Sequence, residues 1–171
     1  ILDLVAISVF EVANAVSPRP VYDVQLLSEK GGPVVSSSGV PVETRAFSSA
    51  KLDTILVTGW LRPQPSSSAL LGYMQAASTA ARRIGSICTG AFILAEAGLL
   101  DGRRATTHWA FARNMQAQFP KIKMQEDKIY TVDGPVWTSA GMTSCIDLCL
   151  AMVEDDLGAD IARDVARKMV V

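Results

Sequence analysis

Apolar and polar residues alternate along the chain in blocks that predict helices and strands in turn. Residues 3–15 are apolar at most positions and polar only at intervals, which predicts a helix buried on most sides. Residues 21–28 have a strand-like pattern, and the turn at 31–33 precedes two short valine-rich stretches that predict a hairpin. The β-branched run at 54–59 ends in glycine and is typical of a buried parallel strand.

The alternation continues through the second half of the chain. A proline- and serine-rich loop, residues 62–68, leads into a helix with a serine at its N-cap. A strand then runs into Cys88, and the helix after it ends at Gly98, where Leu99 can pack back as in a Schellman cap. The remaining predicted elements are a strand at 104–108, a helix at 111–119, a hairpin of 129–132 with 136–139, a helix at 143–152 and a last helix from residue 160. Strands that alternate with helices favour a parallel sheet covered on both faces, so an α/β fold is predicted.

The composition is that of a single globular domain. The chain has 171 residues, of which 49% are apolar and 19% charged, enough for a substantial core. Its 16 basic and 17 acidic residues leave a net charge of −1, so no basic surface for nucleic acid is expected on this chain. No stretch approaches the roughly 18 apolar residues that a membrane span requires, and the amino terminus lacks the basic segment of a signal peptide.

The three cysteines, Cys88, Cys145 and Cys149, form neither a disulfide framework nor a C-x-x-C pair, which favours the reducing cytoplasm. Cys145 and Cys149 lie four residues apart on a predicted apolar helix and are interpreted as buried small hydrophobes. The same spacing would suit a metal, but the sequence offers no third ligand beside it. No metal and no cofactor is therefore predicted.

Cys88 has the most informative context in the sequence. A short apolar strand meets a turn of small residues there, and a helical pattern begins directly after the cysteine. This strand–turn–helix elbow is how serine hydrolases present a nucleophile. The free N–H groups and dipole of the helix favour an anion, so the thiol is predicted to ionise more easily than a free cysteine. The alternative is a buried, inert cysteine.

His108, the only histidine, follows Cys88 by 20 residues, across one helix and one predicted strand. Adjacent parallel strands would bring it near the thiol, although a lone histidine is as often a structural hydrogen-bonding residue. Asp3 opens the first helix, where charge–dipole stabilisation alone would explain it. The tryptophans, among them Trp60, are interpreted as core or pocket wall, and the charged residues of the carboxyl-terminal region as a solvated face.

The segment from Cys88 to Trp109 resembles the ThiJ/PfpI branch of the class I glutamine amidotransferase-like superfamily. More narrowly, it is similar to the amino-terminal domain of AraC/GlxA-type transcriptional regulators, and segments 136–141, 146–148 and 161–171 support that narrower likeness. The resemblance implies a flavodoxin-like sandwich with a mostly parallel sheet covered by helices on both faces. It also implies one regulatory domain over residues 1–171, without the family's first strand before Ile1 and without the downstream AraC-type helix-turn-helix domain.

The resemblance carries the superfamily's site onto particular residues. The elbow cysteine falls on Cys88, the carboxylate that can hydrogen-bond it on Asp3, and the backbone donors of an oxyanion hole on Thr89 and Gly59. Where the family usually has a second glycine, this chain has Trp60, which would fill the pocket or reshape the oxyanion hole. The family's Gly-Pro and second carboxylate of the first helix are also absent here, which weakens the case for hydrolysis.

The leading hypothesis is a ligand-sensing regulatory domain of an AraC-family transcriptional regulator. A small nitrogen-containing metabolite would bind near Cys88, with Thr89, Gly59, Trp60 and His108 as further ligand-binding residues. The resemblance implies a homodimer that contacts DNA only through a domain beyond this chain. The cysteine usage favours the cytoplasm, and the lack of an apolar span predicts no membrane partner.

Two alternatives remain open. One is a cysteine-dependent hydratase or hydrolase, similar to isonitrile hydratases or amidases, in which Cys88 attacks as a thiolate and Asp3 moves a proton. Isonitrile hydratases share the aspartate and the Cys-Thr pair. The other is a redox sensor that acts through oxidation of Cys88.

Overall fold

A four-stranded sheet forms the centre of the molecule in the computed structural model, which describes residues 2–48 and 51–171. Its strands are, in spatial order, β4 (Thr54–Thr58), β5 (Arg83–Ile87), β9 (Val136–Ser139) and β8 (Tyr130–Asp133). The first three run parallel and β8 is antiparallel to β9, to which a tight turn joins it. The predicted parallel strand at 54–59 and the predicted hairpin at 129–139 are confirmed, but the predicted burial of the first strand is wrong. β4 lies at the edge of the sheet, and Ile55 is its one buried residue.

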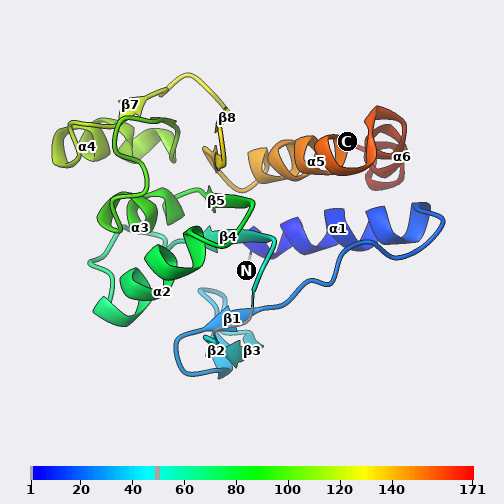
Figure 1. Cartoon of the computed structure of the whole chain (residues 1–171), viewed down its shortest axis with the longest axis horizontal. Coiled ribbons are helices and arrows are strands. Elements are labelled where there is room, and N and C mark those ends of the chain that lie inside the picture. Colours follow the sequence, from blue (N-terminus) through cyan, green and yellow to red (C-terminus); the bar gives the residue numbers. More distant parts are fainter. Residues whose placement is uncertain (1, 49–50) are drawn as a thin grey trace.

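Helices cover both faces of this sheet (Figure 1). One face carries the 3-10 turn η1 (Leu2–Leu4) with α1 (Val5–Val16), α5 (Ser144–Leu157) and α6 (Ala159–Met169). The other face carries α2 (Ser68–Ser78), α3 (Gly90–Glu96) and α4 (Trp109–Gln118). The predicted α/β sandwich with a mostly parallel sheet is therefore confirmed.

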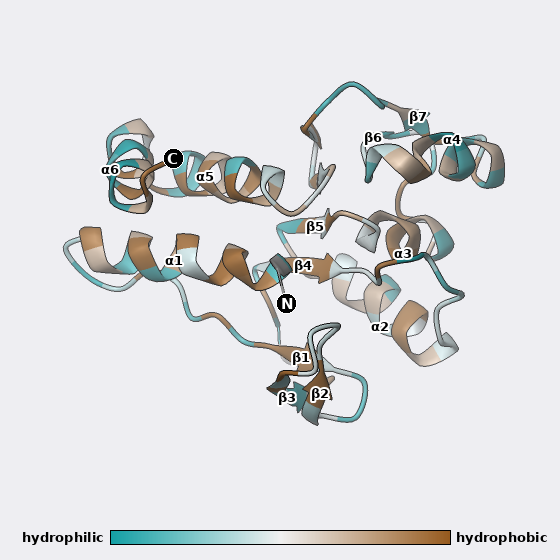
Figure 2. Ribbon diagram, turned by 180° about the vertical axis from the view of Figure 1, so that it is seen from behind, coloured by the Kyte–Doolittle hydropathy of each residue, from teal (hydrophilic) through white to brown (hydrophobic). Residues whose placement is uncertain are grey.

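Two apolar clusters lie on opposite sides of the sheet because successive side chains of a strand point to opposite faces. Ile84 packs with α2 and α3, whereas Ile87 on the same strand packs with α1 and α5. On β9, Val136 and Trp137 divide in the same way. Figure 2 shows α1 as hydrophobic along most of its length, as expected for a helix that packs against both α5 and α6.

Local signals in the sequence account for several element boundaries. The Ser67 hydroxyl accepts the backbone N–H of Leu70 at 3.1 Å and caps α2. Gly98 has φ +75°, and the Leu99 N–H donates to the Leu94 carbonyl at 2.9 Å, which is the predicted Schellman cap.

Two smaller sheets flank the central one. The first contains β1 (Leu27–Ser28), β3 (Pro41–Ala46) and β2 (Gly32–Val35), in that spatial order. The second pairs β6 (Arg104–Ala105) with β7 (Lys123–Met124). The predicted hairpin of the amino-terminal third is thus present as β2 and β3, which pair antiparallel.

Two predicted strands are shorter in the structure than expected, because side-chain oxygens accept backbone N–H groups that would otherwise pair with a neighbouring strand. Of residues 21–28, only the last two form a strand, since the Asn14 side chain accepts the N–H groups of Val21 and Tyr22 at 2.7 and 2.8 Å. Of residues 104–108, only the first two do, and they pair with β7 rather than with the strand before Cys88. Next to them, the Thr106 N–H donates to the Thr138 hydroxyl at 2.8 Å.

The acidic residues at the end of α5 are only partly a solvated face. The side chain of Asp156 is 10% exposed and that of Arg83 is 4% exposed, and the two form an ion pair between α5 and the start of β5. Asp155 also pairs with Arg83, at 3.4 Å, and the Tyr22 hydroxyl donates to Asp156 at 3.0 Å. The predicted solvated face is therefore wrong at Asp156, which anchors α5 to the sheet.

In the described part of the chain, no helix combines the length and the apolar character that crossing a bilayer requires.

Candidate functional site

Cys88 stands between β5 and α3 with a backbone φ of +56°, in the left-handed region that non-glycine residues rarely adopt. Hydrogen bonds on both sides hold this conformation. The Cys88 N–H donates to the Ser139 carbonyl at 3.0 Å, and the Thr107 hydroxyl donates to the Cys88 carbonyl at 2.9 Å. The predicted elbow is confirmed, and its strain is the feature that turns a nucleophile out of a strand.

The end of β4 packs directly against this elbow. A Cβ placed on Gly59 would lie 2.2 Å from the Thr89 hydroxyl oxygen, and one on Gly90 would lie 2.3 Å from the Val57 carbonyl oxygen. Only glycine permits these approaches. The Thr89 hydroxyl also donates to the Trp60 carbonyl, while the Trp60 residue is 38% exposed. Thr89, Gly59 and Trp60 are therefore next to one another beside Cys88, and their contact with a ligand stays a prediction.

Burial raises the pKa of the Cys88 thiol, and the neighbouring charge of Asp3 adds to the rise. The Thr89 N–H donates to the sulfur and acts in the opposite direction, but its effect is the smaller one. The prediction of an easily ionised thiol is therefore wrong: desolvation and a nearby carboxylate outweigh the helix end. Burial also raises the pKa of Asp3 itself.

The structure brings Asp3 and the start of α5 together with Cys88. Burial raises the pKa of the Cys145 thiol to about 12, and the charges of Asp3 and Asp147 contribute to the rise. The Cys145 sulfur donates to the Met142 carbonyl at 2.9 Å. Cys145 and Cys149 are fully buried in the cluster that joins α1 to α5, as predicted for small hydrophobes.

His108 lies at the N-terminus of α4, where its Nδ1 accepts the backbone N–H of Ala110 at 3.3 Å. Its ring lies 5.7 Å from those of Trp109 and Phe111, measured between centroids. The strand that was predicted to place it beside Cys88 does not join the central sheet, so it is Thr107 that reaches the elbow. The predicted site role of His108 stays a prediction. Trp109 is 76% exposed and is not part of the core.

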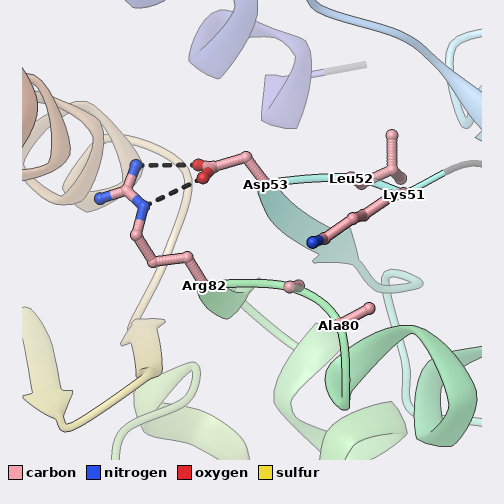
Figure 3. A pocket seen from close by; sticks show the side chains of 6 residues that line it. Lys51, Leu52, Asp53, Ala80 and Arg82 are labelled. Atoms are coloured by element: carbon pink, nitrogen blue, oxygen red, sulfur yellow. Dashed lines mark hydrogen bonds and ion pairs between the residues drawn. The ribbon is translucent and has the colours of Figure 1, made fainter.

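A hollow of about 360 Å³ lies at the opposite end of the sheet from Cys88, between the starts of β4 and β5. Its lining residues are Lys51, Leu52, Asp53, Ala80, Ala81 and Arg82. Figure 3 shows the Arg82 guanidinium paired with the Asp53 carboxylate by two interactions, whose distances are 3.0 and 2.8 Å. Because these opposite charges already satisfy each other, the hollow is a weaker candidate for a binding site than the elbow.

Sequence reasoning missed two residues that contact the elbow, Thr107 and Ser139. Ser139 ends β9, and Thr107 follows β6 by two residues. No local pattern in the sequence indicates that β9 is the neighbour of β5, so these two residues can be assigned to the elbow only when the strand order is known.

The elbow and the sandwich define the class of this protein as an α/β domain with a cysteine at the nucleophile position. Residues 6–155 match the DJ-1/PfpI family, and the chain belongs to that family.

Three relatives illustrate the family context. The chain is 35% identical over 153 residues to the HTH-type transcriptional regulator CdhR of Pseudomonas aeruginosa, which covers 88% of this chain and 45% of the regulator. It is 32% identical over 154 residues to an isonitrile hydratase of Pseudomonas putida, covering 88% of this chain and 66% of the hydratase. The crystal structure of an AraC family transcriptional regulator from Pseudomonas putida superposes with a TM-score of 0.88 at 23% identity, covering 96% of this chain and 90% of that one.

The chain spans less than half the length of the curated HTH-type transcriptional regulators CdhR, GlxA and GbdR. The regulator relatives support the predicted resemblance to AraC/GlxA-type proteins, and the solved structure supports the fold.

Proposed function

We propose that this chain is the ligand-sensing domain of a transcriptional regulator and that a small metabolite binds over Cys88. The observation that carries the proposal is an intact elbow whose thiol has a raised pKa. A nucleophile needs a thiolate, whereas a binding site needs only a shaped surface with polar groups beside it. The regulator relatives support the same conclusion.

The surroundings of the thiol support sensing over catalysis. The carbonyl oxygen of Trp60 lies against the Thr89 hydroxyl, where the family usually has a second glycine. Asp3 is close enough for its negative charge to oppose ionisation of Cys88. Both features work against a stable thiolate and an open oxyanion hole.

The finer parts of the proposal concern the whole regulator. The effector is a nitrogen-containing metabolite, the protein acts in the cytoplasm as a homodimer, and DNA is contacted by a separate helix-turn-helix domain. A tenfold change in DNA affinity needs a coupling free energy of only about 1.4 kcal/mol, so modest differences in ligand contacts suffice.

A metabolite screen tests this function directly. Amines, amino acids and amides are added to the protein and its thermal unfolding is followed, because a ligand at 100 times its Kd stabilises the folded state by about 2.7 kcal/mol. We expect at least one compound to raise the Tm, and Cys88→Ala to weaken its binding at least tenfold in isothermal titration. Cys149→Ala is the matched control, since it removes a thiol from the same cluster away from the elbow. Binding that survives Cys88→Ala unchanged would contradict the proposed site.

The second candidate function is an isonitrile-hydratase-like or amidase-like enzyme. Two observations favour it: Asp3 lies near Cys88, and the isonitrile hydratase relative is 32% identical. Hydration of an isonitrile adds one water and gives an N-substituted formamide. Mass spectrometry therefore detects a product heavier by the mass of one water, about 18 Da. Turnover that disappears in Cys88→Ala would establish the enzyme. We expect no enzymatic turnover, so that wild type and Cys88→Ala both give only the uncatalysed rate of hydration.

A further inference from the structure

Ser139 ends β9 beside the elbow and is fully buried. Its backbone carbonyl accepts the Cys88 N–H, but its hydroxyl has no hydrogen-bond partner among the described residues. A buried polar group without a partner costs about 1–3 kcal/mol, and most such groups in native proteins are satisfied. The open hydroxyl therefore needs an explanation.

The register of the sheet gives the direction of this hydroxyl. Ser139 is paired with Ile87, the residue before Cys88, on the neighbouring parallel strand. Two residues earlier on β9, Trp137 packs into the cluster between the sheet, α1 and α5, so Ser139 points to that same face. Cys88 packs against the same cluster. Ser139 and Cys88 are therefore joined by the backbone hydrogen bond at 3.0 Å, and both side chains belong to the α1 and α5 side of the sheet at its carboxyl edge.

The two thiols of this corner already have partners. The Cys145 sulfur donates to the Met142 carbonyl, and the Cys88 sulfur accepts the Thr89 N–H. Asp3 supplies a carboxyl group within electrostatic reach of both thiols. Ser139 is the one hydroxyl here whose donor capacity is unused among the described residues, and a serine hydroxyl can donate to an oxygen acceptor.

We propose that Ser139 is a further ligand-binding residue of the Cys88 site and donates a hydrogen bond to a carboxylate or amide oxygen of the ligand. The proposal rests on the proposed sensing function and narrows its effector to compounds that carry such an oxygen. A fully buried hydroxyl with no partner among the described residues is unfavourable, and a ligand oxygen over the thiol removes that cost.

Ser86 offers a matched control within the same sheet. It is also fully buried, its hydroxyl also has no partner among the described residues, and it lies two residues before Cys88. It shares the sheet face of Ile84, which packs with α2 and α3, so it points away from the thiol side of β5. If an unpartnered buried serine is merely tolerated in this fold, the two serines should behave alike.

Two alkylating reagents test the proposal on the folded chain. Iodoacetamide carries an amide oxygen and methyl iodide carries none, while both form a carbon–sulfur bond to Cys88 and release iodide. Peptide mass spectrometry measures the rate at Cys88 alone. We expect Ser139→Ala to slow iodoacetamide about three- to tenfold, the effect of one lost hydrogen bond, and to leave the methyl iodide rate unchanged. Ser139→Thr keeps the hydroxyl and should retain the wild-type ratio of the two rates.

Several results would overturn the proposal. They are equal slowing of both reagents by Ser139→Ala, no slowing of either, the same change in Ser86→Ala, or a native Cys88 that neither reagent modifies. The metabolite screen reports the sensing function independently. Cys88-dependent metabolite binding with an unaffected Ser139→Ala protein would remove only the role of Ser139, and the reverse result would remove only the sensor.

Discussion

The two ends of β5 follow opposite physical rules. At its amino end, the buried Arg83 guanidinium pairs with Asp155 and Asp156, donates to the Met152 carbonyl at 3.3 Å and lies 5.3 Å from the Trp137 ring centroid. At its carboxyl end, Cys88 has a strained backbone and the adjacent Ser139 hydroxyl is unpaired among the described residues.

The difference separates stability from function along one five-residue strand. The buried Arg83 charge has acidic and carbonyl partners, because an unpaired buried charge is expensive. Strain and open polar groups persist where the surrounding structure compensates for them, and such places are expected to bind or react. The strain at Cys88 therefore adds a physical argument to the proposal that the ligand binds at the carboxyl end of β5.

The largest expected loss of stability comes from removing the Arg83 ion pairs at the amino end of β5. Arg83→Met removes one of the two arginines that pair with the nearly buried Asp156 carboxylate. We expect the free energy of unfolding in urea to fall by about 3 kcal/mol, the lower end of the range for a broken buried pair, because Arg82 still pairs with Asp156 at 2.8 Å. Arg163→Met is the matched control, because its pair with Asp160 is exposed and should contribute less than about 1 kcal/mol. Equal losses in the two variants would show that the buried network has no special role.

The next effect concerns the close packing at the other end. Gly59→Ala places a methyl group against Thr89 and the following backbone, and we expect a loss of about 1–3 kcal/mol together with an altered alkylation rate at Cys88. Gly72→Ala is the control, since its Cβ would meet nothing within 4 Å inside α2. That variant should be stabilised by about 0.5–1 kcal/mol. A tolerated alanine at 59 would mean that the elbow is not tightly packed.

The pH dependence of the free energy of unfolding tests the buried thiol beside the elbow. Burial raises the pKa of the Cys145 thiol to about 12, whereas the same thiol in the unfolded chain loses its proton near its usual pKa of about 8.5. The unfolded state therefore releases this proton first. The stabilising contribution is complete below about pH 8.5 and is lost as the pH rises, by up to about 1.4 kcal/mol per pH unit.

Urea unfolding at pH 7.5, 8.5 and 9.5 measures this slope. The free energy of unfolding of Cys145→Ala should fall less steeply with pH than that of wild type, because the variant lacks one thiol with a raised pKa. Identical slopes would mean that Cys145 ionises equally well in both states.

The smallest effect tests the strain at the elbow itself. Cys88→Gly and Cys88→Ala both remove the sulfur, but only glycine adopts φ +56° without a steric cost. We expect the glycine variant to be more stable than the alanine variant by about 1 kcal/mol in thermal unfolding. A more stable alanine variant would show that the left-handed conformation carries no strain.

Local patterns in the sequence predicted much of the fold. The elbow at Cys88, the Schellman cap at Gly98 and both hairpins follow from residue periodicity and turn chemistry, which act over a few neighbouring residues. The strand at 21–28 was overestimated because the Asn14 side chain takes the backbone donors there, and propensity does not contain such competition.

The sequence by itself determined the α/β alternation, the cysteine at the elbow and the resemblance that placed Asp3 beside it. Only the tertiary structure decided that β9 lies next to β5 and brings Ser139 to Cys88, and that Asp156 covers Arg83 from 73 residues away. It also decided the direction of the Cys88 pKa, because desolvation and a charge from another helix set that value. Strand order and burial arise from contacts between distant segments, which leave no periodicity in the local sequence.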